Sequence, residues 1–239
     1  MASWLQGFVE KLPKAWAAMS LVRAYGLLIG ACALLACAQL LGALAPLDNG
    51  LLALRAQLVQ RDPTSRIVVV EIDAPSLRAA GEWPWPRERF ATAINNLLGA
   101  DASLVGFDVD VSARSSGDDD AALQASVSAY PGSIVLPTFL QLGSGEETVP
   151  LAAISRDAVL AGVNVELDPD GSVRRYWRGF QHPSYYRASM ASVLAGAPYG
   201  QTEPFLIDFG IRASRIDRLS FEDIHTGHFD PARVRGKTI

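Results

Sequence analysis

The chain has 239 residues, which is long for one ordinary domain and too short for two large ones. Apolar residues make up 49% of it and charged residues 19%, so a sizeable core can form. The formal net charge is a modest −4, and nothing in the sequence resembles the basic stripe that nucleic-acid binding needs. Lysine occurs only at Lys11, Lys14 and Lys237, so an enzyme that binds phosphate through a lysine would have one candidate beyond the N-terminal segment.

An uncharged apolar stretch runs over residues 24–47 and contains both cysteines, Cys32 and Cys37. About 20 apolar residues cross the ~30 Å hydrocarbon core of a bilayer, so the stretch predicts a transmembrane helix. Two alternatives are a buried core helix, for which the run is too long, and a cleaved signal peptide. The A-x-A pattern at residues 43–45 suits cleavage, but Pro46 would follow the scissile bond. An uncleaved signal anchor is favoured.

Basic residues precede the stretch at Lys11, Lys14 and Arg23, which favours a cytoplasmic N-terminus. The predicted organisation is a cytoplasmic segment (1–23), a signal anchor (24–47), a juxtamembrane stalk (48–62, helical over 51–61) and an extracytoplasmic domain (63–239). In a bacterium the domain would be periplasmic or extracellular. Small residues on one face of the span permit close helix packing and predict a homodimer: Gly26, Gly30, Ala33 and Cys37.

Strands and helices alternate in the first half of the domain. Strands are expected over 66–73, 103–112 and 133–139, and helices over 75–80, 87–98 and 119–129. Asp73 or Ala74 should start the first of these helices, Gly81 should end it, and Asp118 should cap the third. This alternation predicts a parallel βαβ core.

The second half predicts antiparallel structure. The turn signal at residues 168–171 separates two apolar runs, 163–167 and 173–180, and favours a hairpin. A helix is expected over 185–195, a strand over 205–209, an extended stretch over 218–224 and a helical turn over 231–235. A further strand should start at 236–239, so the chain is expected to be part of a longer protein. The fold class is α/β: a transmembrane helix, then one domain with a mixed sheet.

Several stretches, in this order, resemble the type 2 CHASE family of bacterial sensory domains. They cover most of the chain from about residue 50. The matching stretches read IVVVEIDAPSL (67–77), GEWPWPR (81–87), LVGFDVDVS (104–112), DDDAALQASV (118–127), AGVNVELDPDGSVRRY (161–176), RLSFEDIHTG (218–227) and DPARVRGKTI (230–239).

The resemblance implies an extracytoplasmic sensor of a membrane receptor that is not itself an enzyme. It also implies further spans after Ile239 and a cytoplasmic output module, such as a cyclic-nucleotide cyclase or phosphodiesterase (a diguanylate cyclase, for example) or a kinase. The stimulus is open: a small molecule, a protein partner, or no ligand at all if the domain is a ligand-free interaction module. No cofactor or metal is expected.

Acidic residues follow two predicted strands, at the edge where open α/β sheets bind ligands. Two tryptophans and an arginine follow the first strand and could add a stacking surface and a cation. The alternative is that the carboxylates cap helices and turns while the tryptophans pack a loop. The candidate ligand-binding residues are Glu71, Asp73, Trp83, Trp85, Arg87, Asp108 and Asp110.

Two further hypotheses concern chemistry. The pattern Asp108-Val-Asp110-Val-Ser112 resembles the nucleophile loop of haloacid-dehalogenase-like phosphatases, whose chemistry needs Mg²⁺ and a lysine. Only Lys237 is available, so an anchored hydrolase is the minor alternative. His225 and His228 are three residues apart and could share a metal, but a closed site needs about four ligands.

Overall fold

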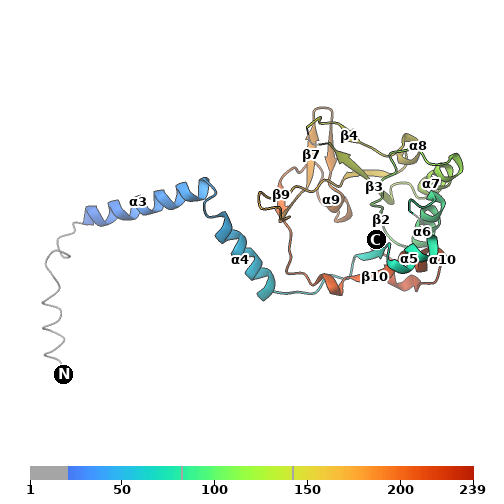
Figure 1. The fold of residues 1–239 in the computed structure, drawn as a ribbon, viewed down its shortest axis with the longest axis horizontal. Coiled ribbons are helices and arrows are strands. Elements are labelled where there is room, and N and C mark those ends of the chain that lie inside the picture. Colours follow the sequence, from blue (N-terminus) through green and yellow to red (C-terminus); the bar gives the residue numbers. More distant parts are fainter. Residues whose placement is uncertain (1–20, 82, 142) are drawn as a thin grey trace, which may run out of the picture. The chain divides into compact units, whose positions relative to one another are not determined.

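The computed structural model describes residues 21–81, 83–141 and 143–239, and the chain divides into two compact units, Met1–Val59 and Gln60–Ile239 (Figure 1). Each unit is described by itself. The predicted cytoplasmic segment, residues 1–23, lies almost entirely outside the described residues.

The first unit contains two helices, α3 (Leu21–Leu40) and α4 (Ala45–Leu58). Between them the chain turns at residues 41–44, where Gly42 has a φ of +72°. The expected continuous helix over 24–47 is therefore wrong. Glycine adopts this left-handed conformation readily, and Pro46 in the first turn suits a new helix start. The stalk helix accordingly begins at Ala45 and ends at Leu58, before the expected residue 61.

Within the described residues, no single helix is both long and apolar enough to cross a membrane. Tyr25–Leu40 and Ala45–Leu58 meet the length and composition requirement only as a pair, bent by 77°. The membrane span stays a prediction.

The second unit begins with β1 (Val68–Glu71), α5 (Ala74–Ala80) and α6 (Arg87–Gly99), close to the expected bounds. Asp73 caps α5 by accepting a hydrogen bond from the Ser76 backbone N–H, and Gly81 ends it with a φ of +81°. Both predictions are confirmed. The side chains of Phe90, Ile94, Leu97 and Leu98 form one apolar face of α6, and this face is buried.

The next three elements are β2 (Val105–Gly106), α7 (Gly117–Ala129) and β3 (Ile134–Leu140). The strand expected over 103–112 pairs through only two residues, because the chain leaves the sheet after Phe107. Ser116 rather than Asp118 caps α7, since its hydroxyl accepts the Asp119 N–H at 3.2 Å. The acidic residues after it lie in the first helical turn, where the helix dipole favours negative charge.

The second half contains shorter elements. They are β4 (Glu147–Thr148), α8 (Ala152–Ser155), β5 (Val159–Gly162), β6 (Arg175–Trp177), β7 (Gly179–His182), β8 (Tyr185–Ala188), α9 (Met190–Leu194), β9 (Pro204–Leu206), η1 (Ala213–Arg215), β10 (Asp217–Ser220), α10 (Phe221–Thr226) and η2 (Pro231–Arg233).

The expected hairpin over 163–180 is wrong, although its turn is present. Asp168 accepts the Gly171 N–H at 2.8 Å, but β6 pairs antiparallel with β9 instead of with residues 163–167. The hairpin in this region is β7–β8. Residues 185–188, expected to start a helix, are its second strand, and α9 begins only at Met190. Residues 218–224 divide between β10 and α10.

The last residues of the chain join two parallel sheets. β1 pairs with β10 on one side, and β2, β3 and β5 are parallel on the other. Thr238 bridges to both Ile67 and Leu104 in parallel. The Val68 N–H donates to the Thr238 carbonyl at 2.9 Å, and the Gly106 N–H to the Ile239 carbonyl at 2.7 Å. The backbone at 237–239 thus pairs with both neighbours, but through an isolated bridge at Thr238 and not through the strand expected at 236–239, since Gly236 still lies in a turn.

Helices α5, α6, α7 and α10 gather on one side of the parallel strands, while β6–β9 and β7–β8 lie on the other (Figure 1). The main core forms beneath the helices, from side chains such as Val68, Ile94, Leu123 and Ile224. A smaller core of Val135, Ala161 and Met190 forms under α9. The mixed α/β class is confirmed.

Candidate functional site

The structure separates most of the predicted ligand-binding residues. The Glu71 carboxylate forms an ion pair with Arg218 of the neighbouring strand β10. Asp73 accepts hydrogen bonds from the Ser76 hydroxyl at 2.5 Å, the Ser76 N–H at 2.9 Å and the Ser220 hydroxyl at 3.0 Å. The bonds from Ser76, chiefly, hold the pKa of Asp73 below its usual value. The carboxylate therefore serves as a helix cap.

The two tryptophans belong to an aromatic cluster. The Trp83 and Trp85 ring centroids lie 5.3 Å apart, and Trp85 packs on Phe90 at 6.0 Å and on Phe221 at 5.1 Å. Trp85 is buried, whereas Trp83 is half exposed. The guanidinium of Arg89 lies over the Trp85 ring at 5.6 Å. Trp85 is enclosed by its neighbours, so of the two tryptophans only Trp83 has part of its ring exposed to solvent.

Arg87 points away from the tryptophans. Its guanidinium is buried and forms an ion pair with Asp120 of α7 and a hydrogen bond to the Ala113 carbonyl. This contact fixes the loop before α7 to the start of α6. A buried, paired guanidinium is not available to a ligand without breaking that contact.

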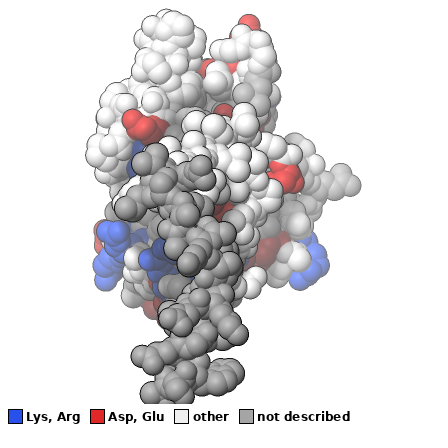
Figure 2. Space-filling view, turned by 90° about the vertical axis from the view of Figure 1, so that its left-hand side faces the viewer, with Lys and Arg blue, Asp and Glu red and all other residues white. Residues whose placement is uncertain are grey.

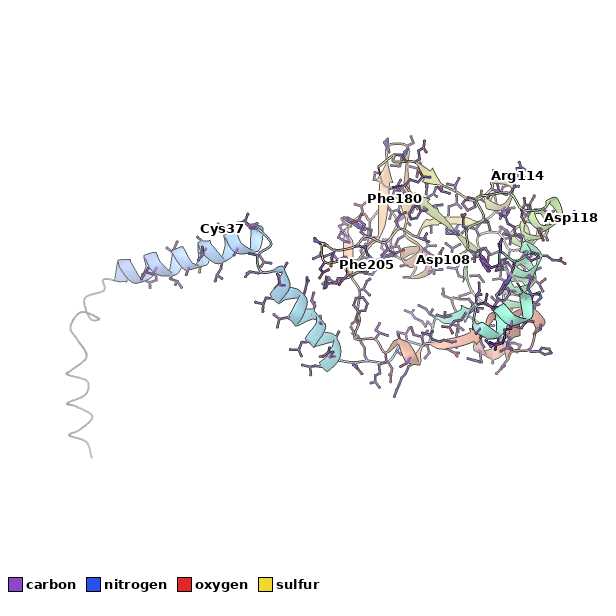
Figure 3. All side chains as sticks on the ribbon, viewed as in Figure 1. Cys37, Asp108, Arg114, Asp118, Phe180 and Phe205 are labelled. Carbon is purple, nitrogen blue, oxygen red and sulfur yellow. The ribbon has the colours of Figure 1, made fainter. Side chains whose placement is uncertain are left out.

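Asp108 and Asp110 lie in the irregular segment after β2. Asp108 is exposed. The pKa of Tyr176 in β6 is raised, mainly because Tyr176 is partly buried and secondly because the negative charge of Asp108 is nearby. Asp110 accepts the Ser112 N–H at 2.8 Å and closes a local turn. Figure 3 shows Asp108 near the middle of the domain, with Arg114 and Asp118 toward α7. Ligand binding by the seven candidates stays a prediction.

The structure places no further catalytic or metal-binding groups beside the residues of the hydrolase and metal hypotheses among those it describes. Lys237 Nζ lies 3.8 Å from Asp217 Oδ2, so the one candidate lysine faces a carboxylate of β10. His225 stacks on Phe221, and His228 hydrogen-bonds to Thr226. Across the described part of the chain, no three His, Cys, Asp or Glu side chains are grouped to hold a metal ion.

A cleft of about 350 Å³ opens where β3 and β5 meet the shorter strands β6 and β7. Leu140 and Gly162, the last residues of β3 and β5, line it together with Trp177, Gly179 and Phe180 from β6 and β7. It therefore lies at the carboxyl ends of two adjacent parallel strands, where open α/β sheets bind ligands. Its volume lies within the range of small-molecule sites.

Several polar side chains line this cleft, and most of them are already bonded. Asn164 accepts the Leu140 N–H and donates to the Leu140 carbonyl, both at 2.8 Å, which ties residue 164 to the end of β3. Gln181 donates to two backbone carbonyls, and the Ser189 hydroxyl accepts the Ser192 N–H at the start of α9. Glu166 is exposed, and no described residue hydrogen-bonds to its carboxylate.

Sequence reasoning missed this cleft. The rule that ligands bind at carboxyl ends of strands was applied to β1 and β2, although it holds equally for β3 and β5. The apolar run before Asp168 could have pointed to residues 162–166. Trp177 and Phe180 reach the cleft only through the pairing of β6 with β9 and of β7 with β8.

The domain is thus of the mixed α/β class, with an open and mostly apolar cleft at the ends of β3 and β5. The family model of the CHASE2 domain matches residues 29–239, nearly the whole chain, and the chain belongs to this family. CHASE2 domains are extracytoplasmic sensory domains of signalling proteins, and their role is sensory rather than catalytic. Searches of the curated proteins and of the solved structures found no match.

Proposed function

We propose that this chain is the membrane-anchored sensory part of a bacterial receptor. Residues 60–239 would lie outside the cytoplasm, detect a stimulus and control a cytoplasmic output module such as a cyclic-nucleotide cyclase, a phosphodiesterase or a kinase. The observation that carries the proposal is the family match over residues 29–239. The uncharged residues before Asp48 and the basic residues at the N-terminus support an anchor with a cytoplasmic start.

The cleft at the ends of β3 and β5 supports detection of a small molecule within this function. It is open, and its wall is mostly apolar with a few polar groups, as in small-molecule sites. One of its residues, Ser189, also caps α9, and Leu194 of this helix packs against β2. A ligand in the cleft could therefore shift α9 through Ser189, and α9 could shift β2 through Leu194.

Cysteine labelling in intact cells tests the topology. Replacing Cys32 and Cys37 with serine leaves no cysteine in the chain. Tyr199→Cys, at a side chain that is 77% exposed, should react with a membrane-impermeant maleimide in intact cells. Ser3→Cys in the same background should react only after lysis. Protection of position 199 until lysis would contradict the proposal.

A further inference from the structure

We propose that the cleft binds a small organic cation, with an apolar and preferably aromatic body and one positively charged nitrogen. This inference rests on the proposed sensory function and names the chemical class of the stimulus. Its basis is the combination of an apolar wall, two aromatic side chains and a single ionisable group.

The wall of the cleft suits an apolar body. Leu140, Val165, Trp177 and Phe180 line it, and Gly162 lets the Phe180 ring pack closely against the end of β5. Trp177 is 38% exposed, so part of its ring remains accessible. Figure 3 shows Phe180 and Phe205 at the end of the domain opposite to Arg114 and Asp118.

The charges around the cleft favour a cation. Among the described residues that line the cleft, Glu166 alone has an ionisable side chain. Figure 2 shows that uncharged side chains cover most of the upper part of the face in view, at the height of β4 and β7 in Figure 1. The carboxylate of Glu166 would repel an anionic ligand, whereas a cation would form an ion pair with it.

Three arginines of the segments around the cleft have partners of their own. Arg187 makes two hydrogen bonds to Glu147, at 2.7 and 3.1 Å. Arg174 binds both Asp168 and Asp170, and the guanidinium of Arg178 lies over the Phe205 ring at 5.3 Å. These contacts leave Glu166 as the lining charge without a partner in the described part of the chain.

The aromatic wall adds to the selection. A cation over the face of a tryptophan is attracted by the electron-rich ring, and the attraction grows as water is excluded. A carboxylate such as Glu166 adds a charge-assisted hydrogen bond. Neither contribution is available to an anion with the same apolar body, so the two should bind differently.

Three probes that share one aromatic body test this directly: 2-phenylethylammonium, 2-phenylethanol and phenylacetate. Saturation-transfer NMR on the full chain in lipid nanodiscs measures their binding at millimolar concentration. The cation should bind most tightly and phenylacetate most weakly. Glu166→Gln should weaken binding of the cation about fivefold, and leave the alcohol unchanged. The matched control is Glu88→Gln, an exposed glutamate in the first turn of α6 that does not line the cleft.

Charge reversal gives the sharpest outcome. Glu166→Lys should invert the order, so that phenylacetate binds more tightly than 2-phenylethylammonium. Equal binding of cation and anion to the unaltered protein overturns the proposal. So does an unchanged order in the lysine variant, or no detectable binding of any probe. The cysteine labelling at positions 199 and 3 tests the membrane topology independently of these probes. If the probes fail and the labelling succeeds, the protein is a receptor with a different stimulus; if the labelling fails, the proposed topology is wrong.

Discussion

The side chain of Leu194 in α9 lies directly against Gly106 in β2. A Cβ atom added to Gly106 would stand 2.8 Å from Leu194 Cδ1 and 3.4 Å from the Ile239 carbonyl oxygen. Glycine at this position therefore lets one helix approach the strand that pairs with the last residue of the chain. Because α9 is capped by Ser189, a residue of the cleft wall, this contact joins the cleft to the middle of the sheet.

Three glycine variants should differ in their effect on the stability of the domain. Gly106→Ala should lower the free energy of unfolding by about 1–2 kcal/mol, because Leu194 can shift only partly. Gly179→Ala should lower it by about 3 kcal/mol, since its Cβ would stand 2.5 Å from the Arg187 backbone oxygen. Gly117→Ala has open space in the first turn of α7 and should be neutral. Chemical denaturation of the three variants measures the order, and equal losses at 106 and 117 would contradict the contact.

The Glu147–Arg187 pair should make stability depend on acid pH. Burial alone would raise the pKa of Glu147, but hydrogen bonds from Arg187, Thr138 and Tyr185, together with the charge of Arg187, outweigh it and lower the pKa below its usual value. The stabilisation is present above the unfolded pKa and is lost as the pH falls through the folded one. Glu147→Gln should cost about 2–3 kcal/mol at neutral pH and flatten the loss of stability below about pH 4.3.

A surface pair provides the control for this prediction. Asp101 and Arg235 lie 3.5 Å apart and are largely exposed. Arg235→Gln should change stability by less than about 0.5 kcal/mol. Unfolding curves at several pH values compare the two variants. If Glu147→Gln leaves the loss of stability at acid pH unchanged, other carboxylates cause that loss.

The bridging role of Thr238 predicts a backbone effect separate from its side chain. Its N–H donates to the Arg66 carbonyl at 3.0 Å. Thr238→Pro removes this donor from a strand with neighbours on both sides and should destabilise the domain by about 3 kcal/mol or more. Thr238→Ala keeps the N–H and should have a small effect. Faster amide exchange at Val68 and Gly106 in the proline variant would locate the damage at both neighbouring strands.

The predicted homodimer can be tested by the two native cysteines. At about 100° per residue, Cys37 lies on the same face of α3 as Gly26, Gly30 and Ala33, whereas Cys32 lies well away from it. Mild oxidant applied to membranes should cross-link a Cys32→Ser variant through Cys37. A Cys37→Ser variant should cross-link far less. Equal cross-linking of both, or of neither, would exclude the proposed face.

Local signals were sufficient for much of the first half of the domain. The cap at Asp73, the end at Gly81 and the apolar face of α6 depend on neighbouring residues alone, and each was predictable. The second half was not, because β6 pairs with β9 across about thirty residues and nothing near Arg175 reveals that partner. Tyr185 and Arg187 fit a helical pattern equally well until Gly179 and Phe180 pair with the same segment.

The candidate site shows the same limit. Acidic residues after strands were found correctly, but their caps and ion pairs depend on Ser220 and Arg218, more than a hundred residues away. Asp73 could equally have faced a ligand. The cleft gathers residues from β3, β5, β6 and β7, so its existence depends on the complete set of strand pairings.

The backbone pairing at residues 237–239 also determines how the domain would respond to a pulling force at Ile239. A tension along this segment would be parallel to both neighbours, so the hydrogen bonds at Val68, Ser103 and Gly106 would be sheared together instead of opening one after another. Shear loading makes a mechanical connection stiff. If Leu194 displaced β2, the hydrogen bond between Gly106 and Ile239 would move Ile239 along the direction of the strand.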